Sequence, residues 1–268
     1  NLRSMYTRLV ESLGAASEVV VWSSGSLQHA ALLWMISALL ADRPACTVKV
    51  IRCQQVRASP DDQFACIERE LRAAEVRELV GAGEKLGTGA RRAHAGNWRA
   101  FTAPLATAFN DRCTGAAEEL ERAGRYHAAF FPRRKGDALQ LSRVDELLLT
   151  CVGGEWSPPS AILLRRSPEG MALRSWLACT GDVFTARRIK QWAEHSPEAP
   201  AVESTLTDGD HLLTGVRYRL SNRGRALLDE GVSSITEAPM CPIGGAAAYD
   251  PQAPVAAQES GEWRLGRL

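Results

Sequence analysis

Hydrophobic positions in the first part of the chain alternate between short continuous runs and helical spacings. Residues 19–22 form a β-branched and aromatic run, which is typical of a strand buried on both faces. A small polar turn follows at 23–26, and apolar residues then fill most faces of a helix over 27–40. A second strand is predicted at 47–51, parallel to the first because a helix crosses between them. The pattern therefore predicts a βαβ unit, and a further helical spacing over 2–13 precedes it.

The stretch after the second strand is richer in charge and in glycine. Residues 61–80 alternate Glu and Arg with apolar residues and predict a helix with a solvated face. Five glycines at 81–96 lie among basic residues, but the spacing matches no phosphate-loop or dinucleotide fingerprint. A mobile connection is the favoured interpretation of this stretch, and a phosphate-binding loop is the alternative. Helices are predicted over 98–109 and 116–126.

A basic, glycine-containing stretch at 133–140 predicts a linker that ends a first domain over 1–132. Beyond it, Ser142 is a candidate N-cap of a helix that ends at Gly153. Further helices are predicted over 160–166, 170–180 and 183–194, a strand over 216–220 and a capped helix over 221–228. Helices, a strand hairpin and a closing helix follow the order of a winged helix over 141–231. Residues 232–268 have little periodicity, and we expect this tail to pack on the body of the protein.

Composition limits the classes of function. A chain of 268 residues with 45% hydrophobic and 24% charged residues is typical of a globular protein with two domains. With 32 Lys and Arg against 31 Asp and Glu, no global field attracts nucleic acid or anionic lipid. Apolar runs of membrane-spanning length are absent from the sequence. Seven scattered cysteines without a CxxC pair predict reduced thiols in the cytoplasm and no metal site or cofactor.

Two groups of residues are candidate sites. The turn between the first strand and its helix offers backbone N–H groups to an anion or other ligand, and it comprises Ser23, Ser24, Gly25 and Ser26. A basic set on helix 183–194 and on strand 216–220 suits either DNA phosphates or a protein surface, and it comprises Arg187, Arg188, Lys190, Arg217 and Arg219. The five histidines have no local arrangement typical of a catalytic triad, so no catalytic residue is assigned.

Five short motifs carry a family resemblance along nearly the whole chain. They are VVVW at 19–22, NWRAF at 97–101, LSRVDELLL at 141–149, GDVFTARRIKQWA at 181–193 and YRLSNRGRALL at 218–228. In this order the chain resembles a bacterial family defined as a domain of unknown function, the DUF family eighteen-thirty-five. The resemblance implies an α/β fold with a small parallel-sheet, Rossmann-like N-terminal domain, followed by a mainly helical winged-helix domain.

The chain departs from that family in two places. The family typically has strongly polar residues after the strand tryptophan, whereas small residues occupy 23–26 here. The family also tends to carry a strand ahead of the first helix, so we expect the N-terminal domain to lack part of its native N-terminus. The first departure favours a non-catalytic adaptor or regulatory protein that associates with a protein partner or a second copy. The alternatives are a winged-helix DNA-binding regulator and an enzyme that uses the 23–26 turn on a nucleotide or phosphorylated substrate.

Overall fold

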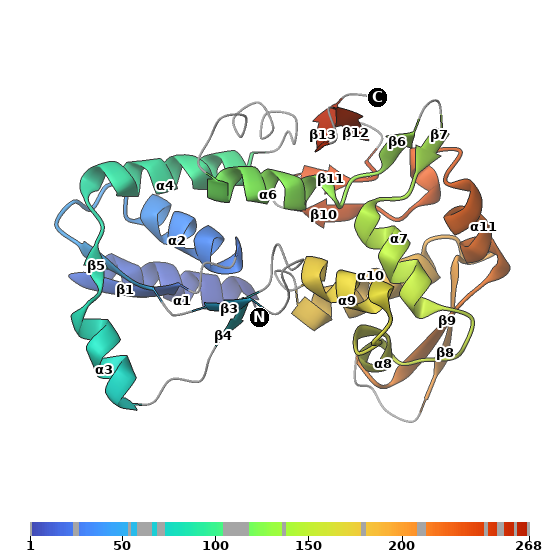
Figure 1. Ribbon diagram of the computed structural model, residues 1–268, viewed down its shortest axis with the longest axis horizontal. Helices are drawn as coiled ribbons and strands as arrows, with labels where there is room; N and C mark the ends of the chain where they lie inside the picture. The colour runs from blue at the N-terminus through green and yellow to red at the C-terminus, as the bar shows by residue number, and fades with distance from the viewer. Residues whose placement is uncertain are drawn as a thin grey trace. The chain divides into compact units, whose positions relative to one another are not determined.

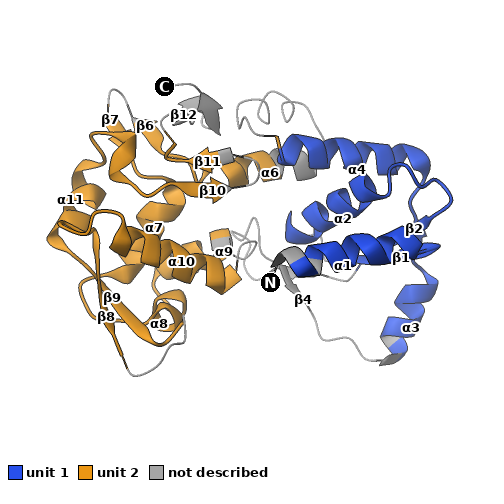
Figure 2. Cartoon of the chain, turned by 180° about the vertical axis from the view of Figure 1, so that it is seen from behind, with its two compact units in different colours: residues 1–102 blue, residues 103–268 orange. Residues whose placement is uncertain are grey.

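The protein is a mixed α/β chain that forms two compact units, Asn1–Thr102 and Ala103–Leu268 (Figures 1 and 2). This division does not coincide with the predicted linker at 133–140. The computed structural model describes residues 2–23, 27–52, 55–57, 66–68, 73–103, 118–135, 138–177, 181–207, 213–243, 246–250, 255–259 and 262–266.

The first unit is built on a three-stranded sheet with the order β1-β2-β5. β1 (Glu18–Ser23) and β2 (Thr47–Arg52) are parallel, as the sequence predicts, and pair in register from Glu18 with Thr47 to Ser23 with Arg52. β5 (Glu84–Lys85) joins antiparallel to β2. The β-branched residues of β1 and β2 supply the sheet side of the core, where Val21, Val48 and Val50 are buried.

Helices α2 (Leu27–Leu39) and α4 (Thr88–Phe101) lie side by side in the first unit (Figure 1). Arg91 of α4 is buried and donates hydrogen bonds to the main-chain carbonyls of Leu40, Arg43 and Cys46, with 2.9 Å to Cys46. These carbonyls follow the C-terminal end of α2, where a cation is favoured by the helix dipole. One arginine thus fastens α4 to the segment that connects α2 with β2.

Three predictions for the first unit are corrected or limited. The helix predicted over 61–80 is shorter, since 66–68 form β4 (Cys66–Glu68), which pairs with β3 (Gln55–Arg57), and α3 (Ala73–Gly81) begins only afterwards. The connection predicted over 81–96 contains the first half of α4, because alanines and the bonds of Arg91 outweigh the helix cost of glycine, about 1 kcal/mol each. The helices predicted over 98–109 and 116–126 can be followed only as far as Phe101 in α4 and from Glu118 in the second unit, because residues 104–117 lie outside the described part of the chain. α1 (Leu2–Ala15) confirms the predicted first helix.

The second unit contains the helices and the hairpin predicted for 141–231. The helices are α7 (Arg143–Val152), α8 (Pro159–Leu163), α9 (Pro168–Leu177), α10 (Gly181–Glu194) and α11 (Asn222–Glu230). The hairpin pairs β8 (Val202–Leu206) with β9 (Val216–Leu220), and a bridge between Ser157 and Tyr218 extends it on the other side of β9. Ser142 and Ser221 cap α7 and α11 through their side chains, as predicted.

Two segments of the second unit, residues 133–140 and the C-terminal tail, form strands that the pattern of hydrophobic residues did not predict. The stretch predicted as a linker forms the hairpin of β6 (Arg133–Lys135) and β7 (Ala138–Gln140), after α6 (Glu118–Ala128). The tail contains η1 (Ile235–Glu237), β10 (Cys241–Ile243), β11 (Ala246–Ala248), β12 (Val255–Glu259) and β13 (Glu262–Gly266). β12 pairs parallel with β6, so residues more than a hundred positions apart share one sheet, β13-β12-β6-β7.

Candidate functional site

The predicted ligand turn after β1 is described only at its first residue. Ser23 ends β1 and is buried, and α2 begins at Leu27. Ser24, Gly25 and Ser26 lie outside the described residues. The role of this turn in binding an anion or another ligand therefore stays a prediction.

The placement predicted for Arg188 on the wet face of its helix is wrong. Its side chain is only 2% exposed and forms a bidentate ion pair with Asp145 of α7, with Nε to Oδ1 and Nη2 to Oδ2 both at 2.8 Å. Nη1 also donates to the carbonyl oxygen of Pro239 at 2.7 Å. The guanidinium is thus fully engaged inside the second unit and is not available to a nucleic acid or a protein partner.

The carboxylate of Asp145 has further donors. Trp192 Nε1 and Ser142 Oγ each donate to it at 2.9 Å. Burial acts to raise the pKa of Asp145, but the charge of Arg188 and these hydrogen bonds outweigh it and hold that pKa below its ordinary value. The same pairing raises the pKa of Arg188 against the opposite effect of burial. Both partners are therefore charged, and the pair stabilises the packing of α7 on α10.

Tyr249 closes this buried cluster from the C-terminal segment. Its hydroxyl oxygen accepts a hydrogen bond from the main-chain N–H of Ser142 at 2.7 Å, and its ring lies 5.5 Å from the Arg188 guanidinium. Burial, and then the charge of Asp145, raise the pKa of the Tyr249 hydroxyl, which stays neutral. Its φ of 61° is left-handed, which costs a non-glycine residue about 1–2 kcal/mol. The contacts of its ring and hydroxyl hold it in that conformation.

The spacing along α10 contained the signal that the sequence reasoning missed. Arg188 falls on the same helical face as Thr185, Ile189 and Trp192, all of which are buried. A cation at such a position needs a carboxylate partner from another element. Asp145 lies in the first turn of α7, where an acidic side chain suits the helix dipole, and this position alone does not reveal its contact with Arg188.

The other residues of the predicted basic set lie at the surface but do not form one continuous positive patch, because two of them are paired with carboxylates. Lys190 is 3.5 Å from Glu194 on the same helix. Arg219 pairs with Glu203 across the hairpin at 2.6 Å and stacks over the ring of Trp156 at 4.6 Å. Arg187 and Arg217 are exposed, and the structure records no ion pair for either. Two of the five predicted contact residues, Arg187 and Arg217, are therefore exposed cations without an ion pair among the described residues.

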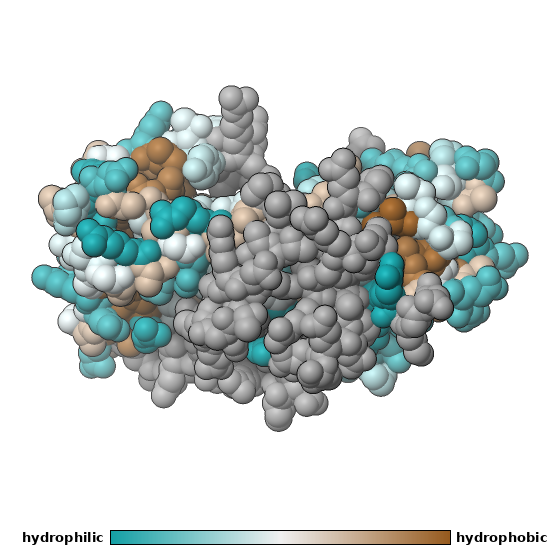
Figure 3. Space-filling view, turned by 90° about the horizontal axis from the view of Figure 1, so that it is seen from above, coloured by the Kyte–Doolittle hydropathy of each residue, from teal (hydrophilic) through white to brown (hydrophobic). Residues whose placement is uncertain are grey.

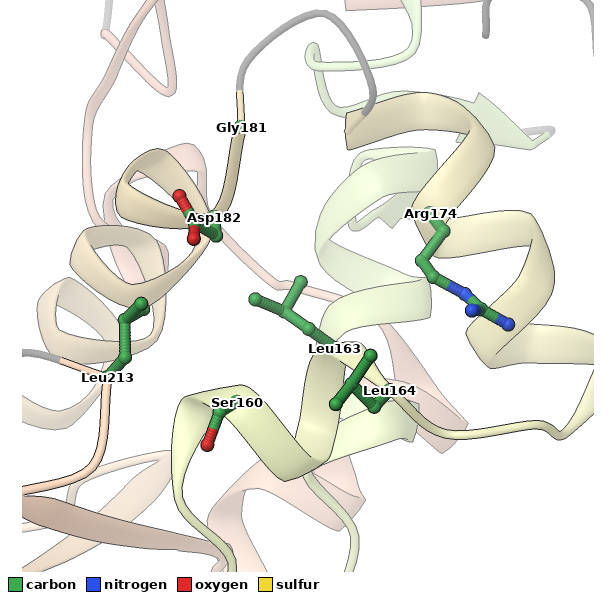
Figure 4. Close-up of a pocket in the computed structure, with 7 residues that line it drawn as sticks. All are labelled: Ser160, Leu163, Leu164, Arg174, Gly181, Asp182 and Leu213. Carbon is green, nitrogen blue, oxygen red and sulfur yellow. The ribbon is translucent and has the colours of Figure 1, made fainter. Parts of the chain in front are cut away.

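An open cavity of about 450 Å³ lies between α8, α9 and the start of α10. We call it the leucine groove, and its lining residues within the described ranges are Ser160, Leu163, Leu164, Arg174, Gly181, Asp182 and Leu213. Leu163 lies between Asp182 on one side and Arg174 on the other (Figure 4). The main-chain N–H of Ser160 donates to the carbonyl of Leu213 at 3.2 Å, which fixes α8 against the segment before β9.

The two charges of the leucine groove differ in how they are satisfied. Asp182 accepts a hydrogen bond from the main-chain N–H of Val183 at 2.7 Å, at the N-terminal turn of α10. Arg174 donates to the sulfur of Met171 and pairs with no carboxylate among the described residues. Its buried Nε has no hydrogen-bond partner in the part of the chain that the structure describes. An incoming carboxylate would be attracted by the charge of the guanidinium.

Apolar side chains at and beside the leucine groove are unusually exposed. Leu164 is 68% exposed, Met171 52% and Val183 46%. Leu206, on the hairpin strand β8, is exposed as well (83%), and Figure 3 shows brown patches among hydrophilic ones on one face of the molecule. Single exposed apolar residues are ordinary, whereas a group around a cavity indicates a binding surface.

The described residues offer little for a metal or a membrane. No group of three His, Cys, Asp or Glu side chains within the described ranges is arranged to hold a metal ion. Cys46, Cys151 and Cys241 are buried free thiols, and burial raises the pKa of Cys151 and of Cys241 to about 11. Among the helices that the structure describes, none has the length and apolar character to cross a bilayer.

Comparisons with known proteins were made in three ways. No protein-family model, no curated protein and no solved structure matches this chain. The resemblance to the domain-of-unknown-function family therefore stays a prediction from the sequence motifs, and the function has to be argued from the site itself.

Proposed function

We propose that the protein is a non-catalytic adaptor or regulatory protein whose second unit is a winged helix that binds a protein partner. The order α7, Ser157 bridge, α8, α9, α10, β8, β9 supports a winged helix, with helices and three short extended segments, two of which form the hairpin. In the first unit, the parallel β1-α2-β2 arrangement supports a small Rossmann-like domain. Both assignments agree with the family resemblance of the sequence.

The leucine groove is the observation that carries the choice of a protein partner. Covering an apolar side chain as exposed as Leu164 removes it from water, which is worth about 1.5–3 kcal/mol for full burial. A protein interface gains most from a few such anchors in a central pocket. The groove offers Leu163, exposed Leu164 and Leu213 in its lining, so a partner that covers them has the apolar core of an interface.

Charge supports the same choice. Residues 141–231 contain eleven Lys and Arg against twelve Asp and Glu, so this unit lacks the basic excess of most DNA-binding modules. In helix-turn-helix proteins, the N-terminal residues of the recognition helix contact base edges. In α10 these positions hold Asp182 and exposed Val183, and the exposed cations Arg187 and Lys190 lie farther along the helix. An acidic and apolar helix start favours a protein surface over DNA.

The test places a photo-crosslinking amino acid at position 164 of the full chain. We expect it to capture one protein in cells, and we expect the purified partner to bind the wild-type chain and to lose at least tenfold in affinity for Leu164→Lys. Thr150, an exposed residue of α7, is the matched control position for crosslinking and for substitution by Lys. Equal crosslinking at both positions, or partner binding unchanged by Leu164→Lys, would contradict the proposal.

DNA binding is the second candidate, because Arg187 on α10 and Arg217 on β9 are exposed and form no ion pair with any part of the chain that the structure describes. Two phosphate contacts would give an affinity for duplex DNA that falls with salt concentration, with a slope lower by about 1 for each arginine removed. Fluorescence anisotropy with a labelled duplex at several salt concentrations measures this slope for wild type, Arg187→Ala and Arg217→Ala. Binding that is absent, or unaltered in both variants, excludes this candidate.

A further inference from the structure

The leucine groove carries opposite charges on its two sides in addition to its apolar lining. Arg174 of α9 and Asp182 of α10 lie on opposite sides of Leu163 and are not ion-paired with each other (Figure 4). The groove therefore presents a positive and a negative side to whatever covers the leucines. A partner gains electrostatically only if its own charges are placed in the complementary order.

The walls of the leucine groove decide between a helical and an extended occupant. The described walls come from α8, α9, α10 and the segment at Leu213, and no strand contributes a lining residue. An extended peptide laid over Leu163 and Leu164 would leave many of its own N–H and C=O groups without partners, which is costly away from water. A helix satisfies its backbone internally and presents only side chains.

We propose that the leucine groove binds an amphipathic helix of a partner protein, with an acidic residue against Arg174 and a basic residue against Asp182. Its apolar stripe covers Leu163 and Leu164, and its carboxylate pairs with the guanidinium charge of Arg174, for which the described residues offer no carboxylate. This inference rests on the proposed function, since it names the kind of segment through which a protein partner docks.

Three labelled 16-residue helical peptides with the same leucine stripe test the charge order. One carries Glu at one end and Lys at the other, one carries Lys at both ends and one carries Glu at both ends. Fluorescence anisotropy with the full chain should rank the mixed peptide first, with about a fivefold loss for each mismatched end. Arg174→Glu should shift the preference to the Lys peptide, and Asp182→Lys should shift it to the Glu peptide.

Two controls keep this experiment decisive. A version of the mixed peptide with a central proline cannot form a continuous helix and should bind at least tenfold more weakly. Circular dichroism of each variant confirms that it is folded. No saturable binding, equal affinity for the three peptides, or full affinity of the proline peptide overturns the inference. The proposed function survives that result if the crosslink at position 164 still captures one protein, and it fails separately if that crosslink is absent.

Discussion

Among the residues that the structure describes, each unit has one buried arginine, and the two side chains are satisfied by different chemistry. Arg91 in the first unit donates to main-chain carbonyls after α2, and no carboxylate takes part in the contacts that the structure records for it. Arg188 in the second unit is bound by the carboxylate of Asp145 from both Nε and Nη2. The comparison teaches that a buried cation can be held by dipoles or by a full charge, and that the two arrangements fail in different ways.

The largest effect is expected for Arg188→Met, which leaves the Asp145 carboxylate buried without its partner. Removing one member of a buried pair typically costs about 3–5 kcal/mol, because the remaining charge stays away from water. Urea unfolding measures the loss, and hydrogen exchange should localise it to peptides from α7 and α10. Arg187→Met, on the exposed face of the same helix, is the control and should change stability by less than about 0.5 kcal/mol.

A double variant sharpens this result. When Asp145→Leu accompanies Arg188→Met, no charge remains to be desolvated, and most of the lost stability should return. If the double variant is as unstable as the sum of the two single variants, the charges are not the cause of the instability.

A smaller effect is expected for Arg91→Met in the first unit. The carbonyls of Leu40 and Arg43 also accept main-chain N–H groups, so the carbonyl of Cys46 is the acceptor that loses most. One buried acceptor left without a donor costs about 1–3 kcal/mol. Hydrogen exchange should rise in α2 and α4 and stay unchanged in α7, with Arg92→Met as the exposed control. A loss as large as that of Arg188→Met would remove the distinction between the two arginines.

The smallest expected effect is a dependence of the unfolding free energy on pH, which comes from the pair of Asp145 with Arg188. Burial raises the pKa of Asp145, but Arg188 and its other donors lower it below 3.8, so the unfolded chain takes up the proton more readily than the folded one. The pair's contribution is therefore complete above the ordinary pKa and is lost as pH falls through the folded pKa. Unfolding free energies from pH 7 to pH 2 should fall more steeply for wild type than for Asp145→Asn. Parallel curves would contradict this expectation.

The sequence predicted elements whose signals are local. The β-branched run of β1, the crossover through α2 and the serine caps of α7 and α11 each depend on neighbouring residues, and the structure confirms them. The strands of the C-terminal segment were not predicted, because β12 obtains its partner from β6 far along the chain. Short strands of alanine and polar residues have no distinct period of their own.

The candidate site shows the same limit. Charge counting identified Arg188 as a surface cation, and only its spacing with Ile189 and Trp192 indicated that it lies inward. The leucine groove could not be predicted, since its residues come from three helices and a turn that are brought together only by folding. The burial of Arg188 and the leucine groove both depend on contacts between elements that are distant in the chain. A single sequence does not show which distant elements come into contact.

The buried cluster around Arg188 also determines which unit can complete its folding first during translation. Its carboxylate comes from position 145, but the carbonyl of Pro239 and the hydroxyl of Tyr249 reach it from the C-terminal segment. A nascent chain that has emerged only as far as α11 holds the charged pair without these closing contacts. The first unit can assemble while translation continues, because N-terminal regions fold first. The second unit is completed only after Tyr249 leaves the ribosome, which makes it the later of the two units to reach its final contacts.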